Sequence, residues 1–133
     1  MLGYPSTACA SHWLPPSLCD AADVFVFISH LTVPQEDRPE LERHFQARAG
    51  LVDDFPGFLY LQLLAPQAGE NAATTLTFLT AWESRADFRR YMQSEEHAIS
   101  HSREPAEIMR RTFVRHEAYE VLLDSRRHPE WTR

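Results

Sequence analysis

LTFLTAWESRADFRRYMQSEEHAISHSR, residues 76–103, predicts a strand followed by two helices, and the rest of the chain is arranged around this unit. Residues 76–81 alternate with a period of two through β-favouring side chains, which is typical of a strand. Ser84 is a suitable helix N-cap with Asp87 three residues later, as in a capping box. Ser94 is a second N-cap, followed by acidic residues that the helix dipole favours.

The two predicted helices carry side chains that could form a binding or catalytic site. Phe88, Tyr91 and Met92 recur at helical spacing and define one apolar face. His97 and His101 are four residues apart and therefore share a face of the second helix. The unit thus combines an indole, a phenol and two imidazoles, from Trp82, Tyr91, His97 and His101.

Composition limits the class of protein. The 133 residues are enough for one domain, and the net charge of -6 argues against nucleic acid or an anionic membrane surface as a partner. All basic residues are Arg, which excludes Schiff-base chemistry and a phosphate-loop lysine. The N-terminus has no signal-peptide or membrane-span pattern, so we expect a cytoplasmic protein. We expect a loosely ordered extension at 1–22, containing Cys9 and Cys19, a domain at 23–124 and a tail at 125–133.

The remaining segments predict an α+β domain in the order β-α-β-β-α-β, a ferredoxin-like arrangement. These segments are strand 24–33, helix 40–52, strand 58–64, hairpin loop 66–73, short helix 105–111 and strand 112–123. Pro39 is well placed as the first helical residue, and helical spacing puts Arg48 on the outer face. Strand 24–33 is apolar on both faces, so a second layer must cover the face that the helices leave open, and a partner subunit is the economical choice.

The histidines allow two kinds of site. A two-histidine metal site lacks a third ligand, whereas one imidazole can bind haem iron if an apolar pocket holds the macrocycle. Side chains for such a pocket are Phe25, Phe27, Phe78, Phe88 and Met92. The same periodicity equally predicts an ordinary aromatic core. No nucleophile elbow, Gly-rich phosphate loop or Cys/His pair supports hydrolase chemistry.

Three motifs carry a family resemblance across residues 24–123. They are Phe55-Pro56-Gly57-Phe58, the strand end Ala81-Trp82-Glu83-Ser84, and Phe88-x-x-Tyr91-x-x-Ser94-x-x-His97-x-x-x-His101. Together they resemble the antibiotic-biosynthesis-monooxygenase superfamily. The resemblance implies a homodimer in which two ferredoxin-like sheets pack face to face as a dimeric α+β barrel.

Within that superfamily the chain is most similar to haem-degrading monooxygenases. The resemblance implies that His101, with His97 as second choice, binds haem iron between the sheet and the helices. Tyr91 stands where these enzymes have a Trp and would press on the macrocycle. Ser29 stands where they have an Asn and would donate a hydrogen bond to dioxygen. An external donor would supply the electrons, because the sequence has no recognisable flavin or nicotinamide motif.

Two alternatives remain at this point. Cofactor-independent oxygenases of aromatic polyketide quinols share the segment around Trp82, although Phe78 and Phe88 stand where that branch has an Asn and a Tyr. Polar groups that could replace them are Tyr60, His30 and His116. The other alternative is a non-catalytic module of the same fold that binds a small hydrophobic ligand.

Overall fold

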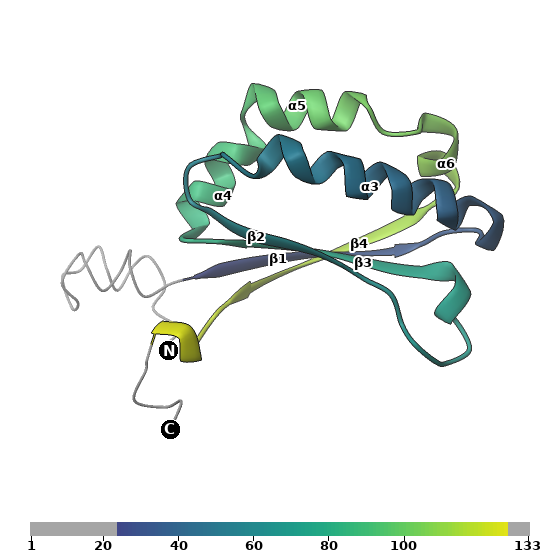
Figure 1. Ribbon diagram of the computed structural model, residues 1–133, viewed down its shortest axis with the longest axis horizontal. Coiled ribbons are helices and arrows are strands. Elements are labelled where there is room, and N and C mark those ends of the chain that lie inside the picture. Colours follow the sequence, from purple (N-terminus) through teal and green to yellow (C-terminus); the bar gives the residue numbers. More distant parts are fainter. Residues whose placement is uncertain (1–23, 128–133) are drawn as a thin grey trace.

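The computed structural model describes residues 24–127, which form one antiparallel four-stranded sheet with its helices α3 to α6 on one side (Figure 1). The elements are β1 (Phe25–Thr32), η1 (Gln35–Asp37), α3 (Arg38–Val52), β2 (Phe58–Leu64), η2 (Ala72–Thr74), β3 (Thr75–Trp82), α4 (Arg85–Met92), α5 (Glu95–Ser102), α6 (Ala106–Arg111), β4 (Phe113–Glu120) and η3 (Ser125–Arg127). The predicted α+β, ferredoxin-like order is confirmed, with the second crossover divided among three short helices. The expectations for residues 1–22, including both cysteines, and for 128–133 lie outside the described residues.

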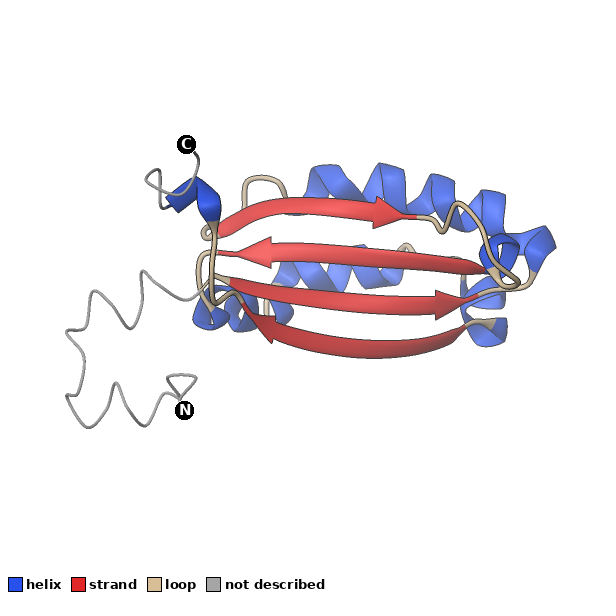
Figure 2. Ribbon diagram, turned by 90° about the horizontal axis from the view of Figure 1, so that it is seen from below, coloured by secondary structure: helices blue, strands red, loops and turns tan. Residues whose placement is uncertain are grey.

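The strand order is β2-β3-β1-β4, so β1 lies between two neighbours and β4 forms an edge. Ser29 is opposite Phe78 on one side and His116 on the other. Because successive strand residues point to opposite faces, Ser29 faces the helices whereas His30 faces away from them. In Figure 2 the strands lie in front of the helices, and no described helix covers the middle of this second face.

Both predicted caps are confirmed. The backbone N–H of Asp87 donates to Ser84 Oγ at 3.1 Å, and Ser84 Oγ donates to Asp87 Oδ2 at 2.9 Å. The backbone N–H of His97 donates to Ser94 Oγ at 3.1 Å. These bonds fix where α4 and α5 begin, and therefore which side chains they direct toward the sheet. The prediction for Pro39 is off by one residue, because the helix begins at Arg38.

Gly57 joins the turn before β2 to the end of β3. Its φ is +87°, a conformation that L side chains rarely adopt, and its carbonyl accepts a hydrogen bond from Glu83 N at 2.7 Å. A Cβ at this position would overlap the side chain of Asp87. The turn therefore needs glycine both for its conformation and for the close approach of α4.

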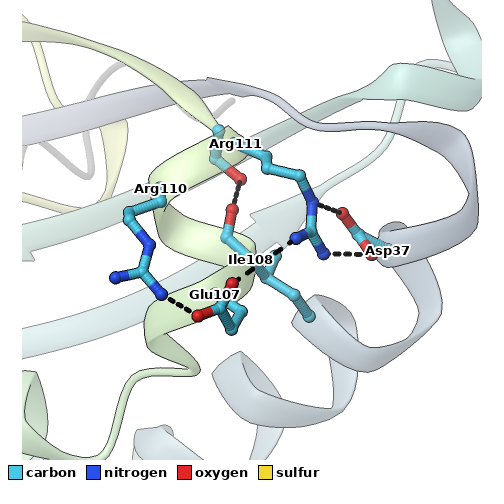
Figure 3. A network of polar contacts seen from close by, with 6 residues as sticks. Asp37, Glu107, Ile108, Arg110 and Arg111 are labelled. Carbon is cyan, nitrogen blue, oxygen red and sulfur yellow. Dashed lines mark hydrogen bonds and ion pairs between the residues drawn. The ribbon is translucent and has the colours of Figure 1, made fainter.

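Arg111 of α6 connects α6 to the start of α3. Its Nε and Nη2 atoms donate to the two carboxylate oxygens of Asp37 at 3.0 and 3.1 Å (Figure 3). The nearby Asp37 carboxylate raises the pKa of Arg111. This forked pair links the segment before β4 to the residue before α3.

Strand β4 is shorter than predicted. It ends at Glu120, and the apolar residues that extended the prediction, Leu122 and Leu123, are 83% and 62% exposed. These two leucines therefore lie beyond the strand and do not pack on the core. Among residues 24–127, no helix combines the length and the apolar character needed to cross a membrane.

Candidate active site

A cavity of about 310 Å³ lies between the sheet and the helices, near the lower end of the size range of small-molecule sites. The sheet contributes Phe27, Ser29, Leu31, Leu61, Phe78, Thr80, Trp82, Val114 and His116 to its floor. The helices and the link between α5 and α6 contribute Phe45, Arg48, Val52, Phe88, Tyr91, Met92, His97, His101, Glu104 and Met109 to its walls and roof. An apolar enclosure with few polar groups is the usual form of a ligand site.

Trp82 is a fully buried residue of the cavity lining. It is 0% exposed, and its Nε1 donates to Thr80 Oγ1 at 3.0 Å. Tyr91, 6% exposed, packs against it with ring centroids 5.2 Å apart. Phe88 joins from α4, with its centroid 5.9 Å from that of Trp82. Because the indole N–H already donates to Thr80, Trp82 offers a ligand an aromatic surface but no hydrogen-bond donor.

Phe25 belongs to this aromatic cluster but not to the cavity lining. Its ring lies 5.0 Å from that of Phe88, which does line the cavity. The remaining aromatic and thioether side chains expected at a pocket, Phe27, Phe78, Phe88 and Met92, do line it. Met92 is 40% exposed, which places it toward the mouth.

The two imidazoles of α5 lie at the roof. Their ring centroids are 4.8 Å apart, and the ring of His97 also packs edge-on against Tyr91 at 5.2 Å. Burial lowers the pKa of His97, and the neighbouring His101 lowers it further, so the neutral form of His97 is favoured. The side chain of His101 is 57% exposed, at the mouth of the cavity.

Glu104 holds His101 in place. The Nδ1 atom of His101 lies 2.8 Å from Glu104 Oε1, and Glu104 Oε2 accepts a hydrogen bond from Arg48 Nη1 at 3.2 Å. A carboxylate acceptor favours the tautomer with the proton on Nδ1, which leaves Nε2 with a free lone pair. The Nε2 atom of His101 is therefore available to a molecule bound in the cavity.

The prediction that Arg48 lies on the outer face of its helix is wrong. Its side chain is 13% exposed, and its guanidinium lies over the ring of Phe78 at 5.3 Å. The reason is tertiary, because the cation stacks on a strand residue and pairs with Glu104, 56 positions away in the sequence. Arg48 is the one arginine among the described residues that line the cavity.

The floor of the cavity carries a second polar pair. Ser29 Oγ and His116 Nδ1 are 3.0 Å apart, and the ring of His116 stacks on Phe27 with centroids 5.1 Å apart. Sequence reasoning named Ser29 as a site residue but gave His116 only as a possible replacement group. The sequence contains a signal for this pair, because each residue is a polar interruption in an apolar predicted strand.

Sequence analysis did not identify Glu104 as a site residue. Its position three residues after His101 is a usable signal, because side chains at this spacing lie close together on a helix and can still meet where the chain leaves it. Within residues 24–127, no group of three or more His, Cys, Asp or Glu side chains is arranged to hold a bare metal ion.

The sequence profile of the family described as "Antibiotic biosynthesis monooxygenase" matches residues 24–103. The chain belongs to this family. The fold resemblance inferred from the motifs is thereby confirmed.

One relative of this chain is a protein from Mycobacterium tuberculosis named haem oxygenase (mycobilin-producing). It is 42% identical over 64 residues, which are 48% of this chain and 58% of the relative. The aligned part thus spans little more than half the length of that curated relative.

Solved structures extend the comparison. The haem degrader MhuD from Mycobacterium tuberculosis, solved with two haems in its active site, is 33% identical with a TM-score of 0.62, over 75% of this chain and 97% of that one. SnoaB, a cofactor-independent oxygenase from Streptomyces nogalater, has a TM-score of 0.60 over 77% of this chain and 96% of that one. Its identity of 17% shows a shared fold alone.

Proposed function

We propose that this chain is a haem-degrading monooxygenase that binds haem in the cavity between sheet and helices. The observation that carries the proposal is the arrangement of His101, Glu104 and Arg48 at the mouth of an apolar cavity. It provides one imidazole with an available nitrogen, one carboxylate that orients it and one cation. Similarity to a haem degrader at 33% identity supports the same assignment.

The residues present fit haem as a substrate. His101 would ligate the iron through Nε2, because Nδ1 is engaged by Glu104. The apolar walls, including Phe27 and Phe78, would surround the macrocycle, and Arg48 would face its anionic carboxylates. Haem supplies the iron that activates dioxygen, and an external donor supplies the electrons.

The remaining predicted residues have defined tasks in this proposal. Tyr91, buried between Trp82 and His97, would press on the macrocycle from a fixed position. Ser29, on the opposite wall, would donate a hydrogen bond to oxygen. His97 is second choice as a ligand, because its ring packs on Tyr91, whereas the imidazole of His101 is oriented by Glu104.

A second copy of the chain would cover the open face of the sheet. This face carries apolar side chains such as Val26, Ile28 and Leu79, which alternate with the residues directed toward the helices. Tyr119 on the same face is 48% exposed. A homodimer formed through this face would remove these side chains from water, as the dimeric barrel requires. Analytical ultracentrifugation at micromolar concentration tests it, and a stable monomer would contradict it.

The haem assignment is tested by titrating the protein with hemin. We expect a sharp Soret band that is lost in His101→Ala and retained in His97→Ala, a matched pair from the same helix face. With reductant, oxygen and catalase, the band should then decay. Binding without decay would favour a ligand-binding module, and hemin binding no tighter than to an unrelated acidic protein would refute the proposal.

A second candidate is a cofactor-independent oxygenase of an aromatic quinol. The observation that favours it is the Ser29–His116 pair, which would serve as a base within an aromatic cavity. The hydrogen bond from Trp82 to Thr80 argues against a quinol oxygenase, because the indole N–H is then not available to bind a quinol. Oxygen uptake with a quinol in the absence of hemin separates the two candidates.

A further inference from the structure

Ser29 and His116 are placed by the sheet itself. They are direct partners in the register of β1 and β4, and their side chains point to the same face, into the cavity. Their Oγ and Nδ1 atoms are 3.0 Å apart, a distance at which one group donates and the other accepts. The pair lies on the sheet wall, whereas His101 lies on the helical wall.

His116 reaches both the cavity and the solvent. One face of its ring is held by Phe27, at 5.1 Å and an interplanar angle of 28°. The residue is nevertheless exposed, because β4 is an edge strand. An imidazole in this position can exchange protons with water while its Nδ1 remains bonded to a hydroxyl inside the cavity.

The other hydroxyl group on the cavity floor, that of Thr80, already accepts a hydrogen bond. Thr80 Oγ1 accepts the indole N–H of Trp82, and the remaining floor residues are apolar. The titratable side chains that line the other walls are Arg48, Tyr91, His97, His101 and Glu104. Of these, Arg48, His101 and Glu104 are engaged with one another. Ser29 and His116 therefore form a separate polar unit.

We propose that Ser29 and His116 are a proton-transfer pair that connects solvent to the reacting end of the cavity. Protonated His116 donates its Nδ1 proton to Ser29 Oγ as the Ser29 hydroxyl proton passes to an oxygen atom of the bound reactants. Ser29 is unchanged, His116 becomes neutral, and it regains a proton from solvent. The oxygen gains the proton, while electrons come from the external donor.

This inference rests on the proposed oxidative function for its acceptor. Reduction of oxygen takes up protons along with electrons, and an apolar cavity offers few routes for them. An amide side chain at position 29 could donate a hydrogen bond but could not relay a proton. The serine, together with an imidazole on the neighbouring strand, can do both.

The pair is tested first without any ligand, by recording ¹⁵N NMR of the histidine side chains against pH. In the wild type we expect one dominant tautomer for neutral His116, and in Ser29→Ala a changed tautomer ratio and titration midpoint. Thr32→Ala, an exposed hydroxyl on the same strand, is the matched control and should leave the His116 signals unchanged. Identical His116 signals in the wild type and Ser29→Ala would overturn the pair, whatever the cavity binds.

The second test is turnover of hemin. His116→Ala should lower the rate by about a hundredfold, with hemin affinity within about twofold of the wild type. Added imidazole should restore the rate, a response that loss of packing would not give. His116→Gln, which keeps a polar side chain, should fold and also be slow, with a flatter pH profile because it cannot titrate. Full activity in either variant, or a loss in His116→Ala that imidazole does not relieve, would overturn the relay. Failure of the wild type to bind hemin would refute the haem proposal, and the NMR result would still decide the pair.

Discussion

The Nδ1 atom of His101 and the Oε1 atom of Glu104 lie 2.8 Å apart, at the junction between α5 and α6. Glu104 is the less exposed partner, at 13% against 57% for His101. The more buried carboxylate therefore orients the more exposed imidazole. The same carboxylate also holds Arg48 through its second oxygen, so one residue sets the position of two cavity groups.

Glu104→Ala should weaken hemin binding roughly five- to tenfold, since losing an orienting hydrogen bond costs about 1 kcal/mol. Glu104→Gln should lie between this variant and the wild type, because its amide oxygen can still accept from Nδ1. Glu107→Ala, which removes an exposed glutamate of α6, is the matched control. Equal hemin affinity in Glu104→Ala and the control would contradict an orienting role.

Stability should fall as the solution is acidified below neutral pH. Burial lowers the pKa of both His97 and His44 in the folded protein below the ordinary 6.5. The unfolded chain therefore binds more protons than the folded chain, and the free energy of unfolding decreases as pH drops below about that value. Urea unfolding at pH 7.5 and 5.5 measures the difference. His97→Gln should reduce it, and an unchanged pH dependence in that variant would contradict the assignment.

A second acid-sensitive window belongs to Glu117. Hydrogen bonds from His30 and Arg115 lower its pKa from 4.5 to about 2. The stabilisation is present above pH 4.5 and is lost as pH falls toward 2. Glu117→Gln should remove pH dependence in this lower window and leave the window near neutral pH intact. Acid titrations followed by circular dichroism distinguish the two.

Ser94→Ala should destabilise the fold by about 1 kcal/mol, because it removes the N-cap of α5. Ser94→Asp should retain most of the stability, since aspartate is also a good cap. Ser102→Ala, an exposed serine at the end of the same helix, should change stability by less than about 0.5 kcal/mol. Urea midpoints with unchanged slopes measure all three variants, and equal losses at both serines would contradict the capping argument.

Gly57→Ala should be more damaging than Gly69→Ala. Both glycines have positive φ, +87° and +115°, so both substitutions introduce backbone strain. At Gly57 the added Cβ also overlaps Asp87, whereas at Gly69 nothing lies within 4 Å. We expect a difference of about 1 to 3 kcal/mol from overpacking, measured by urea unfolding. Similar losses at both sites would show that conformation alone requires the glycine.

Sequence reasoning succeeded where structure is decided locally. Ser84 and Ser94 were predicted as caps because the capping bond spans three residues. The strand pattern also predicted an uncovered face. Arg48 was misplaced because helical periodicity cannot reveal an ion pair formed across 56 positions. The contact between Ser29 and His116 spans 87 positions and depends on β4 pairing with β1 in one register.

The alternation along β1 gives adjacent residues opposite environments. Ser29 belongs to the cavity. His30, the next residue, donates from Nε2 to Glu117 Oε1 at 2.8 Å on the other face, where its Nδ1 lies 3.3 Å from Thr77 Oγ1. A shift of the strand by one position would exchange them, placing an imidazole in the cavity and a hydroxyl on the outer face. Insertion or deletion of one residue before Ser29 could thus change the chemistry of both surfaces at once, without any substitution in either.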